Sequence, residues 1–178
     1  MIDTNHSPFD IFTQWLELAK ENEPVDHNAM CLSTADESGY VRGRYVLLKE
    51  HDETGFVFYT NSLSQKGHDL ARNPKAALTF YWKSLKRQVR IEGDVEDVGD
   101  RQADAYYNSR HRQSRIGAWA SRQSEPLASR EELIERTHDV ETQFKDREDI
   151  PRPPHWRGYR VRPERIEFWI ERDYRLHD

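Results

Sequence analysis

Two spacings of hydrophobic positions divide the chain into helices and strands. Near the start, Phe9, Phe12, Leu16 and Ala19 recur at steps of three and four residues, which predicts an amphipathic helix beginning at Pro8. Farther along the chain, short apolar runs are separated by turn residues, a pattern typical of antiparallel strands. The strands are expected at 29–35, 40–49, 56–60, 75–82, 87–98, 156–163 and 165–171.

Three more helices are indicated by capping residues and by apolar stripes. They are expected at 62–74, 100–109 and 129–147. Ser62 or Ser64 can cap the first of these, and Ser129 with Glu132 has the spacing of a capping box at the start of the last. Residues 110–124 are expected to form an arginine-rich connector.

Six or seven strands with peripheral helices indicate an α+β protein built on a closed or nearly closed antiparallel barrel. The 178 residues fit a single domain, 1–178, because one core commonly serves about 100–200 residues. Within it we expect an N-terminal helical segment, two groups of barrel strands, and a helical, arginine-rich segment. These cover residues 1–25, 29–98 with 155–178, and 99–150, respectively.

Composition adds that the core is lean. Hydrophobic residues make up 35% of the chain, whereas globular proteins average about 45–50%. The charges nearly cancel, at a net charge of −5, and aromatic residues reach 11%. We therefore expect a folded domain that buries further surface against a partner subunit or a bound ring system.

Several classes of protein are excluded by features that the sequence lacks. It has no run of 18 apolar residues, and its opening MIDTNHSPFD is not a secretory leader, so a cytoplasmic protein without a membrane partner is expected. Cys31 and eight scattered histidines offer no metal-ligand spacing, so no metal site is expected. The glycine-rich signatures of dinucleotide-binding proteins, nucleotide hydrolases and serine hydrolases are also absent.

Residues 101–122 carry a local excess of positive charge. They hold five arginines against one aspartate, a balance of +4 in a chain whose total is −5. Either an anionic ligand binds nearby, or acidic residues of another element, such as the helix at 129–147, compensate the arginines. Nucleic acid is a poor candidate for the anion because the chain as a whole is acidic.

Three basic residues lie where a phosphate could be held. Arg44 and Lys49 interrupt apolar faces of their strand, although a charge near a strand end commonly reaches water. Lys66 falls in the first turn of a helix that follows a strand, where free backbone N–H groups attract anions. The alternative for Lys66 is an exposed helix lysine.

Polar and aromatic residues elsewhere could contact a planar heterocycle. Gln88 and the pair Gln123-Ser124 could hydrogen-bond its edge, or belong to the ordinary surface. Trp169 lies on the strand face opposite three apolar residues, where packing against a helix or a subunit is the simpler interpretation. Arg175 and His177 share one side of an expected extended strand, where a frayed tail is the default.

Eight short motifs occur in one order along the chain. They are RYVLLK (44–49), FYTN (58–61), SQKG (64–67), RQVRIEG (87–93), YYNSR (106–110), SRIGAWASRQS (114–124), IEFW (166–169) and RLHD (175–178). Taken together, the motifs resemble those of the pyridoxamine/pyridoxine phosphate oxidase family. The resemblance covers about residues 8–178 and implies an antiparallel split β-barrel that binds FMN, with 99–150 on the substrate side.

The resemblance also implies roles for individual residues. The implied FMN ligands are Arg44, Lys49, Tyr59, Thr60, Lys66, Gln88, Gln123, Ser124 and Trp169. The implied substrate ligands are Lys49, Tyr106, Arg110, Ser114, Arg175 and His177, of which the last two are the catalytic residues beside the pyridine ring. The positive charge of 101–122 would then serve two phosphorylated ligands in one pocket.

The reaction implied by the resemblance makes pyridoxal 5'-phosphate. Pyridoxamine 5'-phosphate or pyridoxine 5'-phosphate would lose hydride from its 4′ carbon to the flavin, with dioxygen as electron acceptor and hydrogen peroxide as product. Members of the family are homodimers with flavin at the subunit interface, which agrees with a lean core.

Three departures from the family pattern leave alternatives open. Gln65 stands where an arginine is common, the chain ends at Asp178 before a further arginine and strand, and the N-terminal segment is short. One alternative is a phenazine-pathway-type flavin oxidase of the same fold, in which Arg110 and Ser114 would be expected to differ. The other is a non-catalytic protein that binds FMN or pyridoxal phosphate.

Overall fold

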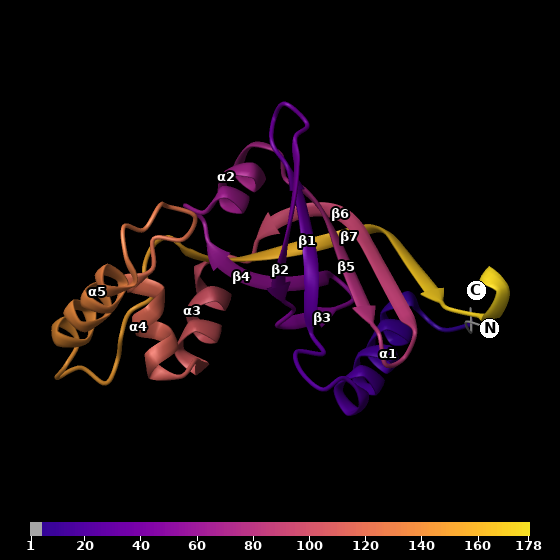
Figure 1. Ribbon diagram of the computed structural model, residues 1–178, viewed down its shortest axis with the longest axis horizontal. Helices are drawn as coiled ribbons and strands as arrows, with labels where there is room; N and C mark the ends of the chain where they lie inside the picture. The colour runs from indigo at the N-terminus through magenta and orange to yellow at the C-terminus, as the bar shows by residue number, and fades with distance from the viewer. Residues whose placement is uncertain (1–4) are drawn as a thin grey trace. The chain divides into compact units, whose positions relative to one another are not determined.

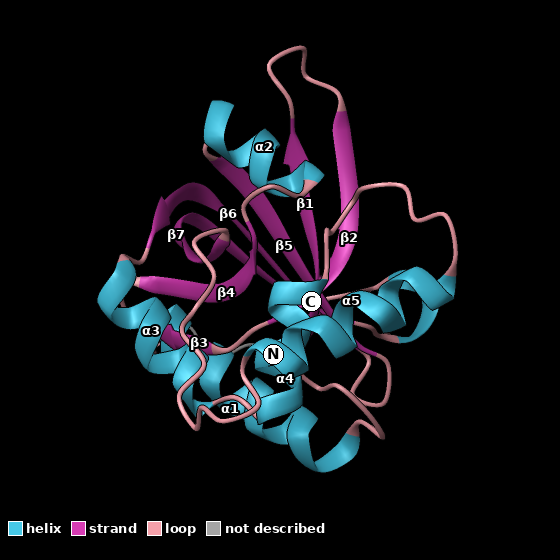
Figure 2. Ribbon diagram, turned by 90° about the vertical axis from the view of Figure 1, so that its left-hand side faces the viewer, coloured by secondary structure: helices cyan, strands magenta, loops and turns pink. Residues whose placement is uncertain are grey.

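The computed structural model describes residues 5–178, so the first four residues of the segment predicted at 1–25 lie outside it. Its strands form one sheet in the order β2-β1-β5-β6-β7-β4-β3. The strands are β1 Ala29–Ala35, β2 Val41–Leu47, β3 Glu50–Asp52, β4 Gly55–Asn61, β5 Lys75–Trp82, β6 Arg87–Asp97 and β7 Trp156–Ile170. This strongly curled sheet (Figure 2), antiparallel in pairs such as β1 with β2, confirms the predicted α+β barrel class.

Five α-helices accompany the sheet, and four of them, α1, α2, α3 and α5, were predicted from the sequence. They are α1 Pro8–Asn22, α2 Gln65–Arg72, α3 Asp100–Ser109, α4 Arg112–Ala120 and α5 Arg130–Gln143. The side chains of Ser7 and Ser129 accept hydrogen bonds from backbone N–H groups of α1 and α5, as helix caps do. Among the described residues, no helix is long and apolar enough to cross a membrane.

The chain forms two compact units. The first consists of Met1–Phe58, Asp69–Glu96 and Arg160–Asp178, and the second of Tyr59–His68 and Asp97–Tyr159. The first contains α1 and most of the sheet, whereas the second contains α3, α4 and α5 (Figure 1). The strands β4 and β7 continue along the chain from one unit into the other.

An aromatic cluster fills the core of the first unit. The Phe12 ring of α1 lies 4.9 Å from the Phe56 ring, 5.2 Å from the Phe80 ring and 6.1 Å from the Trp82 ring. All four side chains are buried, and these offset and edge contacts stabilise the packing beyond the area they bury. The predicted helix therefore buries its apolar stripe against the sheet, and large rings compensate for the small number of apolar residues.

The second unit has a smaller core between α4 and α5. Ile116, Phe144 and Ile150 are buried together, with Trp119 and Val140 packed against them. Helix α4 corrects the sequence analysis, which expected a connector at 110–124. Its apolar positions have helical spacing but occupy only a few residues, too short a stripe for the pattern to stand out.

Two further corrections concern the end of the chain. Pro163 does not divide 156–171 into two strands, because β7 continues through it. Strand β6 approaches closely here, since a Cβ on Gly93 would lie 1.9 Å from the Arg162 carbonyl oxygen. The last residues are not extended: a 3-10 turn, η1 Asp173–Arg175, forms where backbone hydrogen bonds join Ile170 and Asp178.

Candidate functional site

A pocket of about 360 Å³ opens within the second unit, and five of the predicted site residues line it. Its lining residues are Tyr59, Thr60, Asn61, Arg110, Ser114, Gly117, Ala118, Ser121, Gln123 and Trp156. They come from β4, from α4 and the residues flanking it, and from the start of β7. Among the described residues, no aspartate or glutamate lines this pocket, so its donors suit an anionic, aromatic ligand.

Arg110 is the cation of this pocket, and rings rather than carboxylates surround it. Its guanidinium carbon lies 5.0 Å from the centroid of the Trp156 ring and 5.9 Å from that of Tyr107. Its Nη1 atom is buried and has no hydrogen-bond partner in the described part of the chain. Burial is the main cause that lowers the pKa of Arg110, as expected for a charge that no anion compensates.

Three nearly parallel rings stand beside Arg110. The Tyr59 ring lies 4.2 Å from the Tyr106 ring at 10° and 4.9 Å from the Trp156 ring at 6°. The position of Tyr59 depends on a glycine, because a Cβ on Gly158 would lie 2.6 Å from Tyr59 Cε1. The fold thus builds an aromatic wall of stacked rings next to the cation.

Lys66 lies in the first turn of α2, as predicted, but it is not an exposed helix lysine. Only 6% of its surface is accessible. Its Nζ donates hydrogen bonds to Ser64 Oγ at 3.1 Å and to Gln123 Oε1 at 3.2 Å. Thr60 Oγ1 donates to the same Gln123 oxygen at 3.2 Å. The alternative of an exposed lysine is therefore wrong, and Lys66, Thr60 and Gln123 form one polar cluster.

The sequence left open that acidic side chains of α5 compensate the excess positive charge of 101–122, but among the described residues they do not. Arg112 donates to the backbone carbonyl oxygens of Phe144 and Arg147, at 2.7 and 2.8 Å. The one aspartate of the segment, Asp104, pairs with Arg152 at 2.6 Å. Among the described residues no carboxylate pairs with Arg110, so its charge stays available for a ligand.

The other predicted residues divide between the units. Tyr106 belongs to the second unit through its stack on Tyr59, whereas Ser124 is exposed, has a φ of +71° and does not line the pocket. In the first unit, the rings of Trp169 and His177 are 4.7 Å apart. The remaining members of that unit are Arg44 and Gln88, which are half-buried, and Lys49 and Arg175, which are exposed.

Some lining residues were not singled out from the sequence. Asn61, Gly117, Ala118 and Ser121 lie inside motifs whose other members were chosen, so their neighbours in the chain were the available signal. Trp156 follows a proline-rich stretch and gave no signal, because its role depends on packing against residues about 50 and 100 positions away along the chain.

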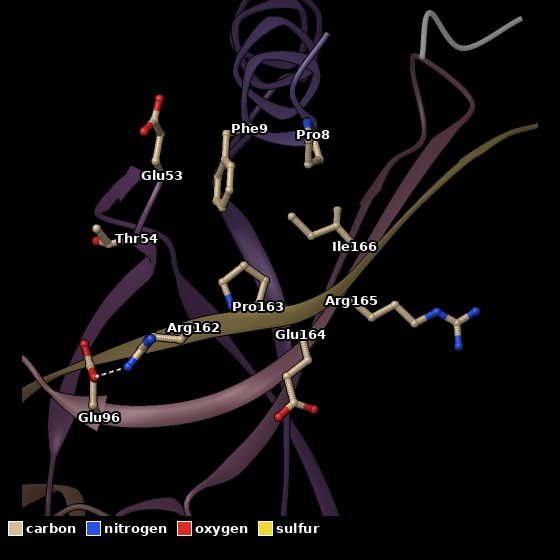
Figure 3. Close-up of a pocket in the computed structure, with 10 residues that line it drawn as sticks. All are labelled: Pro8, Phe9, Glu53, Thr54, Glu96, Arg162, Pro163, Glu164, Arg165 and Ile166. Atoms are coloured by element: carbon tan, nitrogen blue, oxygen red, sulfur yellow. Dashed lines mark ion pairs between the residues drawn. The ribbon is translucent and has the colours of Figure 1, made fainter. Parts of the chain in front are cut away.

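A larger hollow, of about 610 Å³, lies in the first unit (Figure 3). Phe9, Pro163 and Ile166 give it an apolar floor, and charged residues form its rim. Arg162 at the rim pairs with Glu96 at 3.6 Å (Figure 3). None of the predicted site residues line this hollow, and in the described part of the chain no group of His, Cys, Asp or Glu could hold a metal ion. The smaller pocket is therefore the candidate site.

Known proteins resemble this chain over most of its length. Residues 18–169 match the sequence profile of a family described as pyridoxamine 5'-phosphate oxidase. The chain belongs to this family of oxidoreductases. A Brucella canis protein described as pyridoxine/pyridoxamine 5'-phosphate oxidase is 54% identical over 171 residues, which are 96% of this chain and 84% of that one.

Solved structures give the fold of the family. PhzG from Burkholderia lata, in complex with tetrahydrophenazine-1-carboxylic acid, is 28% identical and covers 98% of this chain and 85% of its own, with a TM-score of 0.91. A pyridoxamine 5'-phosphate oxidase-related, FMN-binding protein from Nostoc punctiforme is 13% identical, covers 97% and 96% of the two chains, and has a TM-score of 0.69. This oxidase-family chain thus has the split-barrel fold expected from its motifs.

Proposed function

We propose that this oxidase oxidises the 4′ carbon of pyridoxamine 5'-phosphate or pyridoxine 5'-phosphate to the aldehyde of pyridoxal 5'-phosphate. Dioxygen accepts the two electrons and leaves as hydrogen peroxide, and the amine substrate also consumes water and releases ammonia. The observation that carries the proposal is the buried, unpartnered Nη1 of Arg110 in a pocket without carboxylates. A phosphorylated aromatic ligand satisfies both the cation and the aromatic wall.

The cofactor that we propose is FMN, and the donor set fits it. Lys66 is a buried cation beside the hydroxyl of Thr60 and the amide of Gln123, a combination that suits a phosphate or the polar edge of a ring. Bound FMN would supply the two-electron acceptor that side chains lack. The full proposed set of FMN ligands is Arg44, Lys49, Tyr59, Thr60, Lys66, Gln88, Gln123, Ser124 and Trp169.

The remaining residues would hold and orient the substrate. We assign the phosphate of the vitamin to Lys49, Tyr106, Arg110 and Ser114, of which Arg110 and Ser114 line the pocket. We assign the pyridine ring to the catalytic residues Arg175 and His177, which would align the reacting carbon. Replacing Arg175 with alanine should lower kcat while FMN stays bound, and an unchanged kcat would remove this assignment.

We extend the proposal to a homodimer with flavin at its interface. The edge strand β2 exposes Val41, Tyr45 and Leu47 at 65%, 79% and 36% of their surface, a row of apolar side chains that a second copy could cover. Gln88, one of the proposed FMN ligands, lies directly opposite the exposed Tyr81 in the antiparallel pair β5–β6. Both side chains therefore lie on the same face of the sheet. Light scattering tests this: Tyr45→Glu should halve the mass measured for the wild type.

A related activity has a specific observation in its favour. PhzG, whose solved structure contains a tetrahydrophenazine carboxylic acid, shares the fold at a TM-score of 0.91. A carboxylated tricycle would carry one negative charge where a vitamin phosphate carries two, so it would interact with Arg110 less strongly.

We place the proposed activity in the cytoplasm, a reducing compartment that would keep the free thiol of Cys31 reduced.

The experiment that tests the function uses the purified chain with FMN added. Pyridoxine 5'-phosphate, pyridoxamine 5'-phosphate and reduced phenazine carboxylic acids are supplied in turn, and pyridoxal 5'-phosphate and peroxide are measured together. We expect equal amounts of both products from the vitamin phosphates. Oxidation of the tricycle alone would favour the phenazine-type alternative, and a yellow protein without turnover would favour a non-catalytic carrier.

A further inference from the structure

The first unit holds a buried carboxylate to which the proposed function gives no role. Asp69 lies on α2, and only 2% of its surface is exposed. A carboxylate in such a place is costly unless charges and hydrogen bonds compensate it. Asp69 Oδ2 accepts a hydrogen bond from Thr34 Oγ1 at 2.7 Å, and Arg42 Nη1 lies 3.3 Å from Oδ1.

The pairing with Arg42 does not by itself explain why a carboxylate is buried at Asp69. Arg42 already pairs with Asp36, whose Oδ2 is 3.0 Å from the same Nη1 atom, and its guanidinium also lies over the Tyr40 ring. A second carboxylate beside Arg42 would be surplus if that were its only contact. Arg44, with Nη2 at 3.8 Å from Asp69 Oδ2, is a second cation beside this carboxylate.

The hydroxyl of Thr34 links Asp69 to Arg44. Thr34 Oγ1 lies 2.7 Å from Asp69 Oδ2 and 2.7 Å from Arg44 Nη1. An ionised carboxylate can only accept hydrogen bonds, so the single hydroxyl proton of Thr34 points at Asp69. The lone pairs of the hydroxyl are thereby turned toward Arg44. Thr34 is 2% exposed, which leaves little room for water to take over either contact.

This arrangement gives one side of the Arg44 guanidinium its hydrogen-bond acceptors and leaves another side without any among the described residues. Nη1 donates to Thr34 Oγ1 and to the Leu32 carbonyl oxygen at 3.1 Å, which uses both of its hydrogens. The Nε–H and Nη2–H groups have no hydrogen-bond acceptor among the described residues, since Asp69 is too far from Nη2. These two groups form the edge of a guanidinium that binds two phosphate oxygens side by side.

We infer that Asp69 is a positioning residue for the cofactor phosphate: through Thr34 it fixes Arg44 so that the Nε/Nη2 edge is left for FMN. The inference rests on the proposed function, in which Arg44 is an FMN ligand. It adds Asp69 and Thr34 to the residues that determine how tightly the phosphate is held. Neither residue needs to touch the cofactor.

Comparing FMN with riboflavin isolates the phosphate, because riboflavin has the same ring and lacks that group. Dissociation constants for both are measured by quenching of flavin fluorescence, with the wild-type chain and with Asp69→Asn. We expect Asp69→Asn to weaken FMN binding about 10-fold and to change riboflavin binding less than 3-fold. In an Arg44→Lys background the Asp69→Asn effect on FMN should largely disappear, because the two changes act on one contact.

Matched variants separate positioning from a general loss of structure. Asp36→Asn removes a carboxylate from Arg42 but none from Arg44. The dissociation constant for riboflavin divided by that for FMN should therefore not change. Thr34→Val removes the linking hydroxyl and should lower this ratio, as Asp69→Asn does. Thr34→Ser keeps the hydroxyl and should keep the wild-type ratio. Thermal unfolding of each flavin-free variant shows whether it is folded.

The outcomes distinguish the inference from the proposed function. A folded Asp69→Asn protein with an unchanged ratio, or with tighter FMN binding, would overturn the inference and leave the proposed function intact. If Asp69→Asn does not fold, equal ratios in Thr34→Val and Thr34→Ser would overturn it instead. A wild-type chain that binds neither flavin would contradict both proposals.

Discussion

The half-buried arginines of the two units have opposite surroundings. In the first unit, Arg42 and Arg44 share the carboxylates of Asp36 and Asp69, so their charges are largely compensated inside the protein. In the pocket of the second unit, Arg110 lies over aromatic rings with no carboxylate partner among the described residues. The comparison indicates that the carboxylates beside Arg42 and Arg44 fix the orientation of these side chains, whereas the charge of Arg110 is left for a ligand to compensate.

The largest effect is expected from removing the uncompensated charge of Arg110. Arg110→Ala should lower kcat/KM for pyridoxine 5'-phosphate about 100-fold, or ~2.7 kcal/mol, because the phosphate loses a buried charge-assisted contact. Steady-state kinetics measure this. Arg101→Ala, on the exposed surface of α3 in the same positive segment, is the control and should keep wild-type kcat/KM. Equal behaviour of the two variants would contradict the assignment of Arg110.

A smaller loss is expected from Lys66, the buried cation at the start of α2. Lys66→Ala should weaken FMN binding by about 10- to 100-fold, or ~1–3 kcal/mol, the range of hydrogen bonds made by a charged group. Equilibrium dialysis against FMN measures it. Lys145→Ala, an exposed lysine of the same unit, should bind FMN as the wild type does. A Lys66→Ala protein that stays saturated at wild-type FMN concentrations would show that Lys66 is no anchor.

A carboxylate added to the pocket should compensate the charge of Arg110, as Asp36 and Asp69 do for Arg42 and Arg44 in the first unit. Ser121 lines the pocket and is exposed, so Ser121→Asp can be accommodated. We expect it to raise KM for the phosphorylated substrate about 10-fold, because the new charge repels the phosphate and competes for Arg110. Ser121→Asn, with the same shape and no charge, should raise KM by less than 3-fold. Equal KM values for the two variants would mean that charge compensation is not what distinguishes the pocket.

The smallest expected effect concerns the stability of the first unit. His51 lies between α1 and β4, 5.1 Å from the Phe12 ring, and burial lowers its pKa below the usual 6.5. The folded protein therefore disfavours the protonated ring. The resulting stability is present above pH 6.5 and is lost as pH falls through 6.5 toward the folded pKa, because the unfolded chain takes up the proton first.

Denaturant unfolding at pH 7.5 and pH 5.5 measures this effect. The wild type should lose more unfolding free energy over this interval than His51→Asn, whose side chain does not titrate. His138→Asn, which replaces an exposed histidine on α5, should behave as the wild type does. A loss of the same size in wild type and His51→Asn would contradict the role given to burial.

Local patterns predicted most of the fold. The helix at Pro8, every strand except the short β3, and the cap at Ser129 follow from spacing and capping chemistry, which depend on nearby residues. Helix α4 was missed because its stripe is short, and the joined strand β7 because a proline was given too much weight. Both outcomes are decided by contacts with distant parts of the chain.

The site was predicted less completely, and for the same reason. The motifs named Arg110, Ser114 and Gln123, which do line the pocket, and Lys66, which bonds to Gln123. No local pattern could reveal that Trp156 lies against Arg110 or that Gly158 makes room for Tyr59. Those contacts join segments about 50 to 100 residues apart, and they exist only once the chain has folded.

The central claim is that the pocket of the second unit recognises the phosphate of its substrate. Its most direct test is the ratio of kcat/KM for pyridoxine 5'-phosphate to that for unphosphorylated pyridoxine, measured as pyridoxal product formed by the FMN-loaded wild-type chain. We predict a ratio above about 100, which falls toward 1 in Arg110→Ala. Equal use of the two compounds by the wild type would contradict the claim.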